Sequence, residues 1–183
     1  MWIALILIAV FAVTAIGIFN TFIKRRAFVW EAWSGIDVQL KRRHDLIPNI
    51  LEVVKGYMQF ERKLLEDITN IRASLTNAVT VKEKSERENN LSGAFKSIFA
   101  VVENYPDIKA NQDVLGLQKN LTETEDQIQL ARRYYNGTVR NYNILVESFP
   151  SNILATIFNF KPADFFEIEY ATERNTPDVK FGT

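Results

Sequence analysis

Residues 2–26 read WIALILIAVFAVTAIGIFNTFIKRR, an uncharged run that ends abruptly at three consecutive basic side chains. A helix over residues 2–23 would be about 33 Å long, enough to cross a hydrocarbon core of about 30 Å. The run is longer than the roughly 7–15 apolar residues of a secretory signal peptide, and only Met1 precedes it. We therefore expect an uncleaved membrane anchor over residues 1–26, with a cleaved signal peptide as the alternative.

The orientation of this anchor follows from the basic residues at its ends. Cytoplasmic segments next to a membrane helix are enriched in Lys and Arg, and here the basic residues follow the apolar run. We expect the N-terminus outside and the main domain in the cytoplasm. An anionic leaflet attracts each nearby basic side chain by about 1 kcal/mol. The candidate headgroup contacts are Lys24, Arg25, Arg26, Lys41 and Arg42.

The composition excludes several classes of protein. The chain has 22 basic and 22 acidic side chains, so its net charge of zero argues against a general nucleic-acid binder. The lack of cysteine removes disulfides, thiolate nucleophiles and most structural zinc sites. Seven Gly and five Pro leave little material for tight turns, which disfavours a β-rich fold. We expect an all-α protein.

A long apolar stripe follows the anchor. Its members alternate in steps of three and four, which is typical of one buried face on a long, coiled-coil-like helix. The stripe consists of Trp33, Ile36, Leu40, Arg43, Ile47, Ile50, Val54, Tyr57, Glu61, Leu64, Ile68, Ile71 and Leu75. The spacing passes through Pro48 without a slip, so we expect one continuous helix with a kink.

Three further helices are expected downstream. Residues 91–105 carry a similar stripe of Leu91, Phe95, Ile98, Val102 and Tyr105, and the polar residues 76–90 before it are expected to form a connection and an exposed helix start. A third long helix covers residues 114–149, with Asn111 as its N-cap. Its expected stripe consists of Val114, Leu117, Leu121, Thr124, Ile128, Ala131, Tyr135, Thr138, Tyr142, Leu145 and Phe149. A short apolar helix covers about residues 152–158. The resulting prediction is an N-terminal transmembrane helix followed by an antiparallel bundle of three long helices and one short helix. The bundle spans residues 27–160, and residues 161–183 form an acidic tail.

Five stretches are distinctive when taken together in this order: WSGIDVQLKRRHDLIPN at residues 33–49, VKGY at 54–57, YPDIKAN at 105–111, ARRYYN at 131–136 and FPSN at 149–152. Through these stretches the sequence resembles the LemA family of bacterial membrane proteins. The resemblance implies a single-pass anchor, a helical bundle and a bacterial plasma membrane. It implies little about activity, although some family members are associated with making membrane-bound organelles and some occur with membrane metalloproteases.

Two charged residues, Arg43 and Glu61, interrupt the long apolar stripe and need partners, because a buried unpaired charge is expensive. Glu125 of the third long helix is a candidate partner for Arg43. Tyr135 and Tyr142 lie one heptad apart on the inner stripe of that helix, with hydroxyl groups that need polar partners such as Arg43 or Glu61. We expect these five residues to form a structural polar network. A contact of the Lys41-to-Asp45 cluster with headgroups or an acidic partner is the alternative.

The residue types and their spacing give little support for a catalytic or metal site. His44 is the only histidine, so neither a metal site nor a catalytic triad is expected around it. The carboxylates Glu123, Glu125 and Asp126 are better explained as solvated helix charges. We expect no catalytic residue, cofactor or metal.

The apolar residues near the C-terminus leave two interpretations open. They either pack over the end of the bundle or form an exposed patch that binds the membrane or the next subunit. The group consists of Ile153, Leu154, Ile157, Phe158, Phe160, Phe165 and Phe166.

The function expected from these features is a membrane-anchored, non-enzymatic scaffold. Copies of the chain would associate laterally as a homo-oligomer in contact with lipid, and so organise or shape the membrane or gather partner proteins. The alternatives are a monomeric adaptor for a membrane protease or transporter and, less favoured, an enzyme with a carboxylate site.

Overall fold

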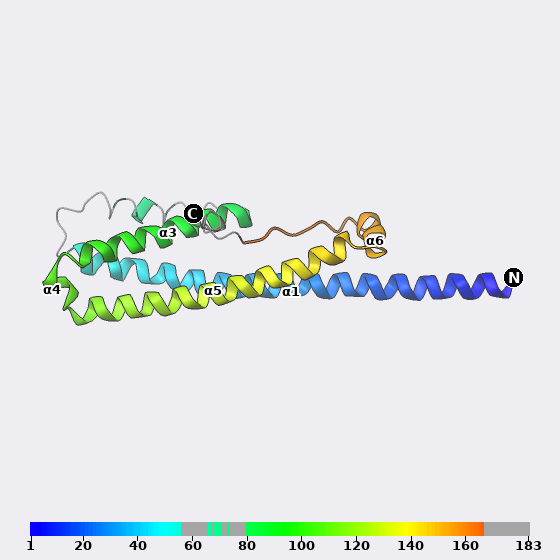
Figure 1. The fold of residues 1–183 in the computed structure, drawn as a ribbon, viewed down its shortest axis with the longest axis horizontal. Coiled ribbons are helices and arrows are strands. Elements are labelled where there is room, and N and C mark those ends of the chain that lie inside the picture. Colours follow the sequence, from blue (N-terminus) through cyan, green and yellow to red (C-terminus); the bar gives the residue numbers. More distant parts are fainter. Residues whose placement is uncertain (56–65, 67, 71–72, 74–79, 167–183) are drawn as a thin grey trace, which may run out of the picture. The chain divides into compact units, whose positions relative to one another are not determined.

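The computed structural model describes residues 1–55, 66, 68–70, 73 and 80–166 of the chain. Within this part the elements are helices and no strand is present, which confirms the all-α expectation. Their order along the chain is α1 (Trp2–Lys55), α3 (Val81–Val102), α4 (Pro106–Lys109), α5 (Gln112–Glu147) and α6 (Ser151–Ile157) (Figure 1). The expectations for Tyr57, Glu61, Leu64, Ile71 and Leu75 lie outside the described residues.

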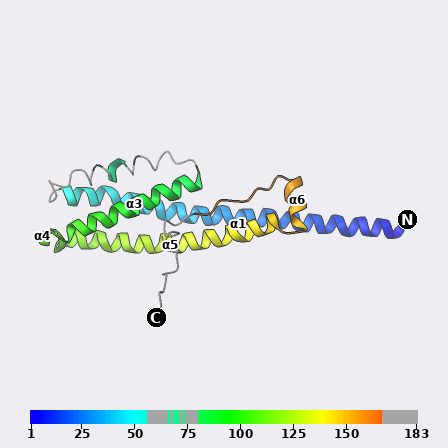
Figure 2. The ribbon, with the colours of Figure 1, turned by 45° about the horizontal axis from the view of Figure 1, so that its top comes forward.

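Helix α1 joins the apolar run to the first helix of the body without a break (Figure 2). Its 54 residues correspond to a length of about 81 Å. Among the described residues, this is the helix long and apolar enough to cross a membrane, and its most apolar window is not buried in the molecule. The anchor and the body therefore share one hydrogen-bonded helix.

Pro48 lies inside α1 and does not end it, which confirms the expected continuity. Proline removes one backbone hydrogen bond and crowds the preceding turn, at a cost of about 3 kcal/mol. The residues around it offset this cost, because Ile47 and Ile50 are buried while Pro48 faces solvent.

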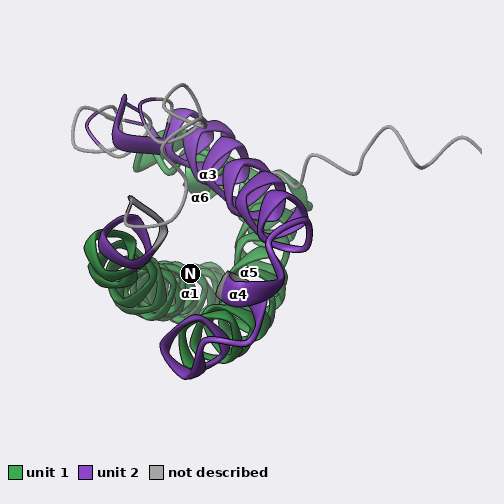
Figure 3. Cartoon of the chain, turned by 90° about the vertical axis from the view of Figure 1, so that its left-hand side faces the viewer, with its two compact units in different colours: residues 1–49, 116–165 green, residues 50–115, 166–183 purple. Residues whose placement is uncertain are grey.

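The chain divides into two compact units, which Figure 3 shows in different colours. Unit 1 contains residues 1–49 and 116–165, and unit 2 contains residues 50–115 and 166–183. Within unit 1, α1 and α5 run antiparallel, because contacts that lie later in α1 lie earlier in α5. These contacts join Phe22 to Tyr142, Trp33 to Tyr135 and Arg43 to Glu125.

The buried stripe of α5 drifts away from a strict heptad repeat. A straight α-helix has 3.6 residues per turn, so its inward face shifts by about 20° in each heptad. In the second half of α5, Tyr135 and Tyr142 are buried as expected, but the stripe positions that alternate with them lie one residue later than expected. The expected positions Ala131, Thr138 and Leu145 are half-buried, and the buried ones are Arg132, Val139 and Val146. Phe149 was wrongly placed in the core: it is 81% exposed, because α5 ends at Glu147.

Helix α3 in unit 2 begins ten residues earlier than its apolar stripe. Its start is fixed by a capping box: Thr80 Oγ1 accepts a hydrogen bond from the Glu83 amide at 3.1 Å, and the Thr80 amide donates to Glu83 Oε2 at 3.3 Å. These bonds satisfy amides that a helix start leaves without partners. The expected apolar residues Leu91, Phe95, Ile98 and Val102 are buried.

Replacing Thr80 by Ala should loosen the start of α3. Loss of an N-cap side chain costs about 1 kcal/mol, which corresponds to about fivefold faster amide exchange in the first turn. Hydrogen exchange of the amides of residues 82–84 measures this effect. The control is Thr122→Ala, because Thr122 is an exposed mid-helix residue whose hydroxyl bonds only to the Gln118 carbonyl in its own helix. Equal exchange in both variants would contradict the capping role.

Candidate functional site

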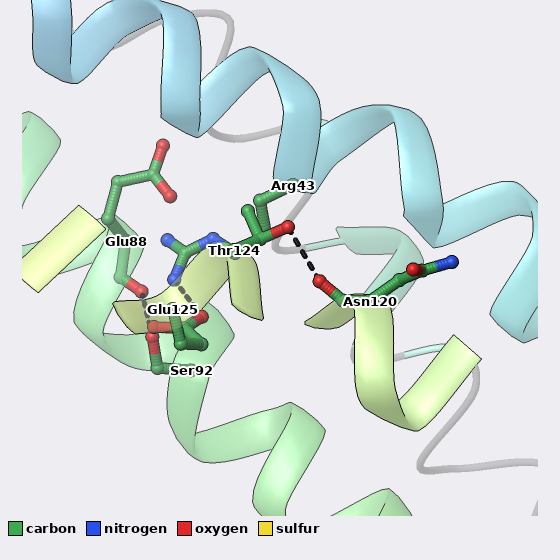
Figure 4. A network of polar contacts seen from close by, with 6 residues as sticks. All are labelled: Arg43, Glu88, Ser92, Asn120, Thr124 and Glu125. Atoms are coloured by element: carbon green, nitrogen blue, oxygen red, sulfur yellow. Dashed lines mark hydrogen bonds and ion pairs between the residues drawn. The ribbon is translucent and has the colours of Figure 1, made fainter. Parts of the chain in front are cut away.

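A buried ion pair lies between the two long helices of unit 1 (Figure 4). Arg43 of α1 is fully buried, and its Nη1 contacts Oε1 of Glu125 on α5, whose side chain is 28% exposed. A buried guanidinium is tolerated only with a carboxylate or other strong acceptors around it. Of the five residues expected in a polar network, the structure thus brings Arg43 and Glu125 together, whereas Glu61 lies outside the described residues.

Thr124, beside Glu125, is also buried, but its hydroxyl group bonds within its own helix and not to the neighbouring one. Its hydroxyl donates to the Asn120 carbonyl at 2.7 Å, within α5 (Figure 4). Such a bond back to the preceding turn satisfies the hydroxyl locally. Thr124 thus bonds within its own helix, and its neighbour Glu125 is the residue that contacts Arg43 on α1.

Tyr135 is buried next to Trp33, with ring centroids 5.4 Å apart. Its hydroxyl donates to the backbone carbonyl of Asp164 at 2.9 Å, and not to Arg43 as the sequence suggested. Burial, with a smaller contribution from the negative charge of Asp164, raises the pKa of Tyr135 to about 12. The hydroxyl therefore stays protonated at neutral pH and remains a hydrogen-bond donor to residues 161–164, the segment after α6, which we call the returning chain.

Asn143 holds the same returning chain one residue earlier. Its Nδ2 donates to the Ala163 carbonyl at 2.9 Å, and its Oδ1 accepts from the Ala163 amide at 2.8 Å. Both backbone groups of Ala163 are thus paired by one side chain. This role of Asn143, which directly follows Tyr142, was not predicted from the sequence.

An aromatic cluster closes the end of unit 1 nearest the apolar run. It contains the buried residues Phe22, Tyr142, Val146, Ala155 and Phe160. The rings of Phe22 and Phe160 stack with centroids 4.6 Å apart, and the Tyr142 ring meets that of Phe22 edge-on at 6.5 Å. Burial raises the pKa of Tyr142, and the nearby charge of Arg26 partly opposes this shift.

The C-terminal apolar group therefore divides into two sets. One set packs on the bundle, as the first interpretation proposed: Phe160 is buried in the cluster, and Leu154 packs against it. The other set stays exposed, as the second interpretation required, with Ile153 at 53%, Ile157 at 66% and Phe158 at 52%.

The candidate headgroup contacts fall into two separate places on α1. Lys24, Arg25 and Arg26 are exposed and directly follow the apolar run, and the Arg26 guanidinium lies 5.4 Å from the Phe160 ring centroid. Lys41 and Arg42 are also exposed, but they lie about 26 Å farther along the helix. This distance far exceeds the thickness of the headgroup layer, so a helix at the usual tilt of about 20° would bring only one of the two sets to it. Headgroup contact stays a prediction for both sets.

The described residues offer no constellation for metal chemistry. Within them, no group of three or more His, Cys, Asp or Glu side chains is placed to hold a metal ion. His44 is half-buried in α1. Glu123 forms an exposed pair with Lys119 at 3.9 Å in its own helix.

Removing the carboxylate of Glu125 should destabilise unit 1. Glu125→Gln removes a carboxylate that contacts the buried Arg43, and we expect a loss of about 1–3 kcal/mol because water still reaches the partly exposed residue 125. The measurement is denaturant unfolding in detergent micelles, followed by circular dichroism at the helical band.

The matched control is Glu123→Gln, which removes an exposed carboxylate from the same helix and should cost less than about 0.5 kcal/mol. Replacing Arg43 and Glu125 together by Met should recover much of the loss, since an apolar pair needs no charge compensation. A loss for Glu125→Gln as small as that of the control would contradict the structural importance of the pair.

Comparison with known proteins agrees with the family resemblance noted in the sequence. The chain is 29% identical to Protein LemA of Metamycoplasma hominis, over 80% of this chain and 64% of that protein, so it spans less than two thirds of this relative. It is 24% identical to Magnetosome protein MamQ 2 of Paramagnetospirillum magneticum, over 91% of this chain and 71% of that protein. It is 20% identical to Magnetosome protein MamQ of Magnetospirillum gryphiswaldense, over 90% and 70%.

The family match and the long apolar helix α1 together indicate a membrane protein. The model of the LemA family matches residues 32–181, which include nearly all of the chain beyond the apolar run. This chain belongs to the LemA family.

Proposed function

We propose that this protein is a membrane-anchored, non-enzymatic scaffold whose copies associate laterally through an outward-facing stripe of α5. The stripe consists of Leu130, Tyr134, Gly137, Asn141 and Ile144, which follow one another in steps of four, three, four and three. This spacing keeps all five on one side of a helix. It is the observation that carries the proposal.

Three large side chains make the stripe apolar although it faces solvent. Leu130 is 49% exposed, Tyr134 is 57% exposed and Ile144 is 56% exposed. Between them, a Cβ added at Gly137 would meet no atom within 4 Å, so the backbone of α5 is open there to a neighbour. Apolar residues at heptad spacing with a glycine between them favour the close approach of a second helix.

The membrane supports a second copy of this chain as the occupant. Anchored copies share one orientation, so α5 helices of two neighbours run parallel and at the same height above the bilayer. A two-fold axis along the membrane normal then places each stripe residue opposite its own counterpart. Confinement to two dimensions raises the effective concentration, so a modest contact area suffices.

The relatives are consistent with a role without catalysis. Protein LemA and Magnetosome protein MamQ are not named for an enzymatic activity. The exposed stripe of α5 is the structural feature that supports a scaffold.

The basic residues support a cytoplasmic body in the bacterial plasma membrane. Lys24, Arg25 and Arg26 follow the apolar run and are exposed, which favours the inner leaflet for this end of the span. We assign headgroup contact to these three residues. Lys41 and Arg42, farther along α1, are better placed to meet an acidic protein surface.

Lateral association should depend on the stripe of α5. The chain lacks cysteine, so a single Ile144→Cys substitution should crosslink to its counterpart in native membranes, while Gln129→Cys on another face of α5 should not. Adding Tyr134→Glu places like charges opposite each other and should reduce the crosslinked fraction by about tenfold or more. The matched control adds Gln129→Glu, which has no counterpart nearby.

Crosslinked products are identified on denaturing gels and by mass spectrometry. Dimers that depend on the stripe support the scaffold. Single-molecule photobleaching in one step throughout would contradict it, and so would crosslinks at Gln129→Cys as efficient as those at Ile144→Cys. Crosslinks from Ile144→Cys to a different membrane protein would identify an adaptor instead.

The proposed orientation is tested with two other single cysteines. A membrane-impermeant maleimide added to intact cells should label Trp2→Cys, whereas Val38→Cys should react only after the cells are permeabilised. Both side chains are well exposed, at 79% and 61%, so the structure does not shield either from the reagent. Labelling in the reverse order would place the body outside.

A further inference from the structure

A contact between α6 and α1 fixes the depth of α6 relative to the bilayer. The rings of Phe19 and Phe158 meet edge-on with centroids 4.8 Å apart. Phe19 belongs to the uncharged run and lies about 7.5 Å along the helix before Lys24, the first charged residue. Phe158, which contacts Phe19, therefore lies beside the apolar run, at the same height along α1.

The segment around α6 is suited to that level. Residues 148–160 contain no charged side chain, and the flanking charges are Glu147 and Lys161. One side of α6 packs inward through Ser151 and Ala155, which are 5% and 3% exposed. The other side presents Ile153 and Ile157 one turn apart, at 53% and 66% exposure.

Phe149, just before α6, extends this exposed surface and is 81% exposed. Four large apolar side chains thus face outward from one short segment: Phe149, Ile153, Ile157 and Phe158. Such an uncharged patch is unusual on a surface that faces water. It is continuous with the exposed apolar surface of α1, because Phe158 contacts Phe19 directly.

We infer that α6 is a second membrane contact, with its outer side inserted in the headgroup and upper acyl region of the leaflet that α1 enters. The inference rests on the proposed anchoring of α1 in a bilayer. Lipid is the occupant because the patch continues the lipid-facing surface of α1 and lies at its depth. Amphipathic segments at an interface bury their apolar side by about 5–10 Å, which matches the level of Phe19.

The consequence is that the body is held at two points. A single helix crossing the bilayer is free to tilt and to shift along the membrane normal. Insertion of α6 beside α1 restricts both motions, because either one would change the depth of α6, which is fixed to α1 and α5 through Phe160 and Ala155. The exposed Lys161 follows the patch and can extend its ammonium group to the headgroups.

The test uses the full chain in phosphatidylcholine vesicles, with an environment-sensitive fluorophore attached to one introduced cysteine. Ile157→Cys reports on α6, Val13→Cys on the anchor and Val38→Cys on the body. All three side chains are more than half exposed, so labelling does not disturb the core. Each label is then challenged with iodide in the water and with nitroxide-bearing lipids in the bilayer.

We expect the label at residue 157 to be quenched by nitroxide lipids, and its quenching by iodide to be about fivefold weaker than at residue 38. The label at residue 13 should behave as fully lipid-embedded. Iodide quenching at residue 157 equal to that at residue 38, with residue 13 in lipid, overturns the inference and leaves the anchor intact. Protection of residue 157 from both quenchers means that protein covers α6, which also overturns it. A label at residue 13 that iodide reaches refutes the anchor itself.

Discussion

The continuity of α1 is the constraint on which the rest of the structure depends. One helix of 54 residues carries the apolar run, the basic residues Lys24, Arg25 and Arg26, and the inner face of unit 1. A flexible linker after the membrane segment would let the body take any orientation. A helix does not permit this, because every turn is joined to the next by backbone hydrogen bonds. The direction of the apolar run is therefore also the direction of the α1–α5 pair.

The ion pair of Arg43 and Glu125 explains how that helix pair finds one register. Apolar residues at heptad spacing look alike after a shift of seven residues, so packing alone distinguishes poorly between registers. Such a shift would move Glu125 by about 10.5 Å along the axis, away from the fully buried Arg43 guanidinium. Because Glu125 is partly exposed, losing this contact costs about 1–3 kcal/mol, which is enough for the charge to select the register that the apolar stripe leaves ambiguous. A single polar residue in an apolar seam has the same effect in coiled coils.

The sequence predicted the features that repeat along a helix and missed those that depend on backbone groups far apart in the chain. The stripe of α1, the extent of α5 and its cap at Asn111, whose Oδ1 accepts from the Asp113 amide, were all readable from side-chain spacing. A helix start was expected within residues 76–90, but the capping box of Thr80 and Glu83 that fixes it at Val81 was not recognised. The sequence did not predict that the apolar run and the first helix of the body form one continuous helix. The change from apolar to basic residues indicates a change in the surroundings of the helix, and it does not show whether the helix continues.

The returning chain after α6 connects two parts of unit 1: the aromatic cluster around Phe22 and the buried face of α5 near Tyr135. Tyr135 and Asn143 hold it through backbone atoms of residues 29 and 20 positions away, which no pattern of side chains encodes. These bonds and the stacked Phe160 fix the chain along α5 over a few residues. A displacement of α6 perpendicular to the bilayer must therefore break these bonds or move α5 with it. Under the proposed placement, α6 inserts into one leaflet and α5 makes the lateral contact between copies. Because the two helices are joined rigidly, association through α5 also fixes how α6 sits in the membrane. A scaffold that shapes the membrane by assembling needs such a rigid connection.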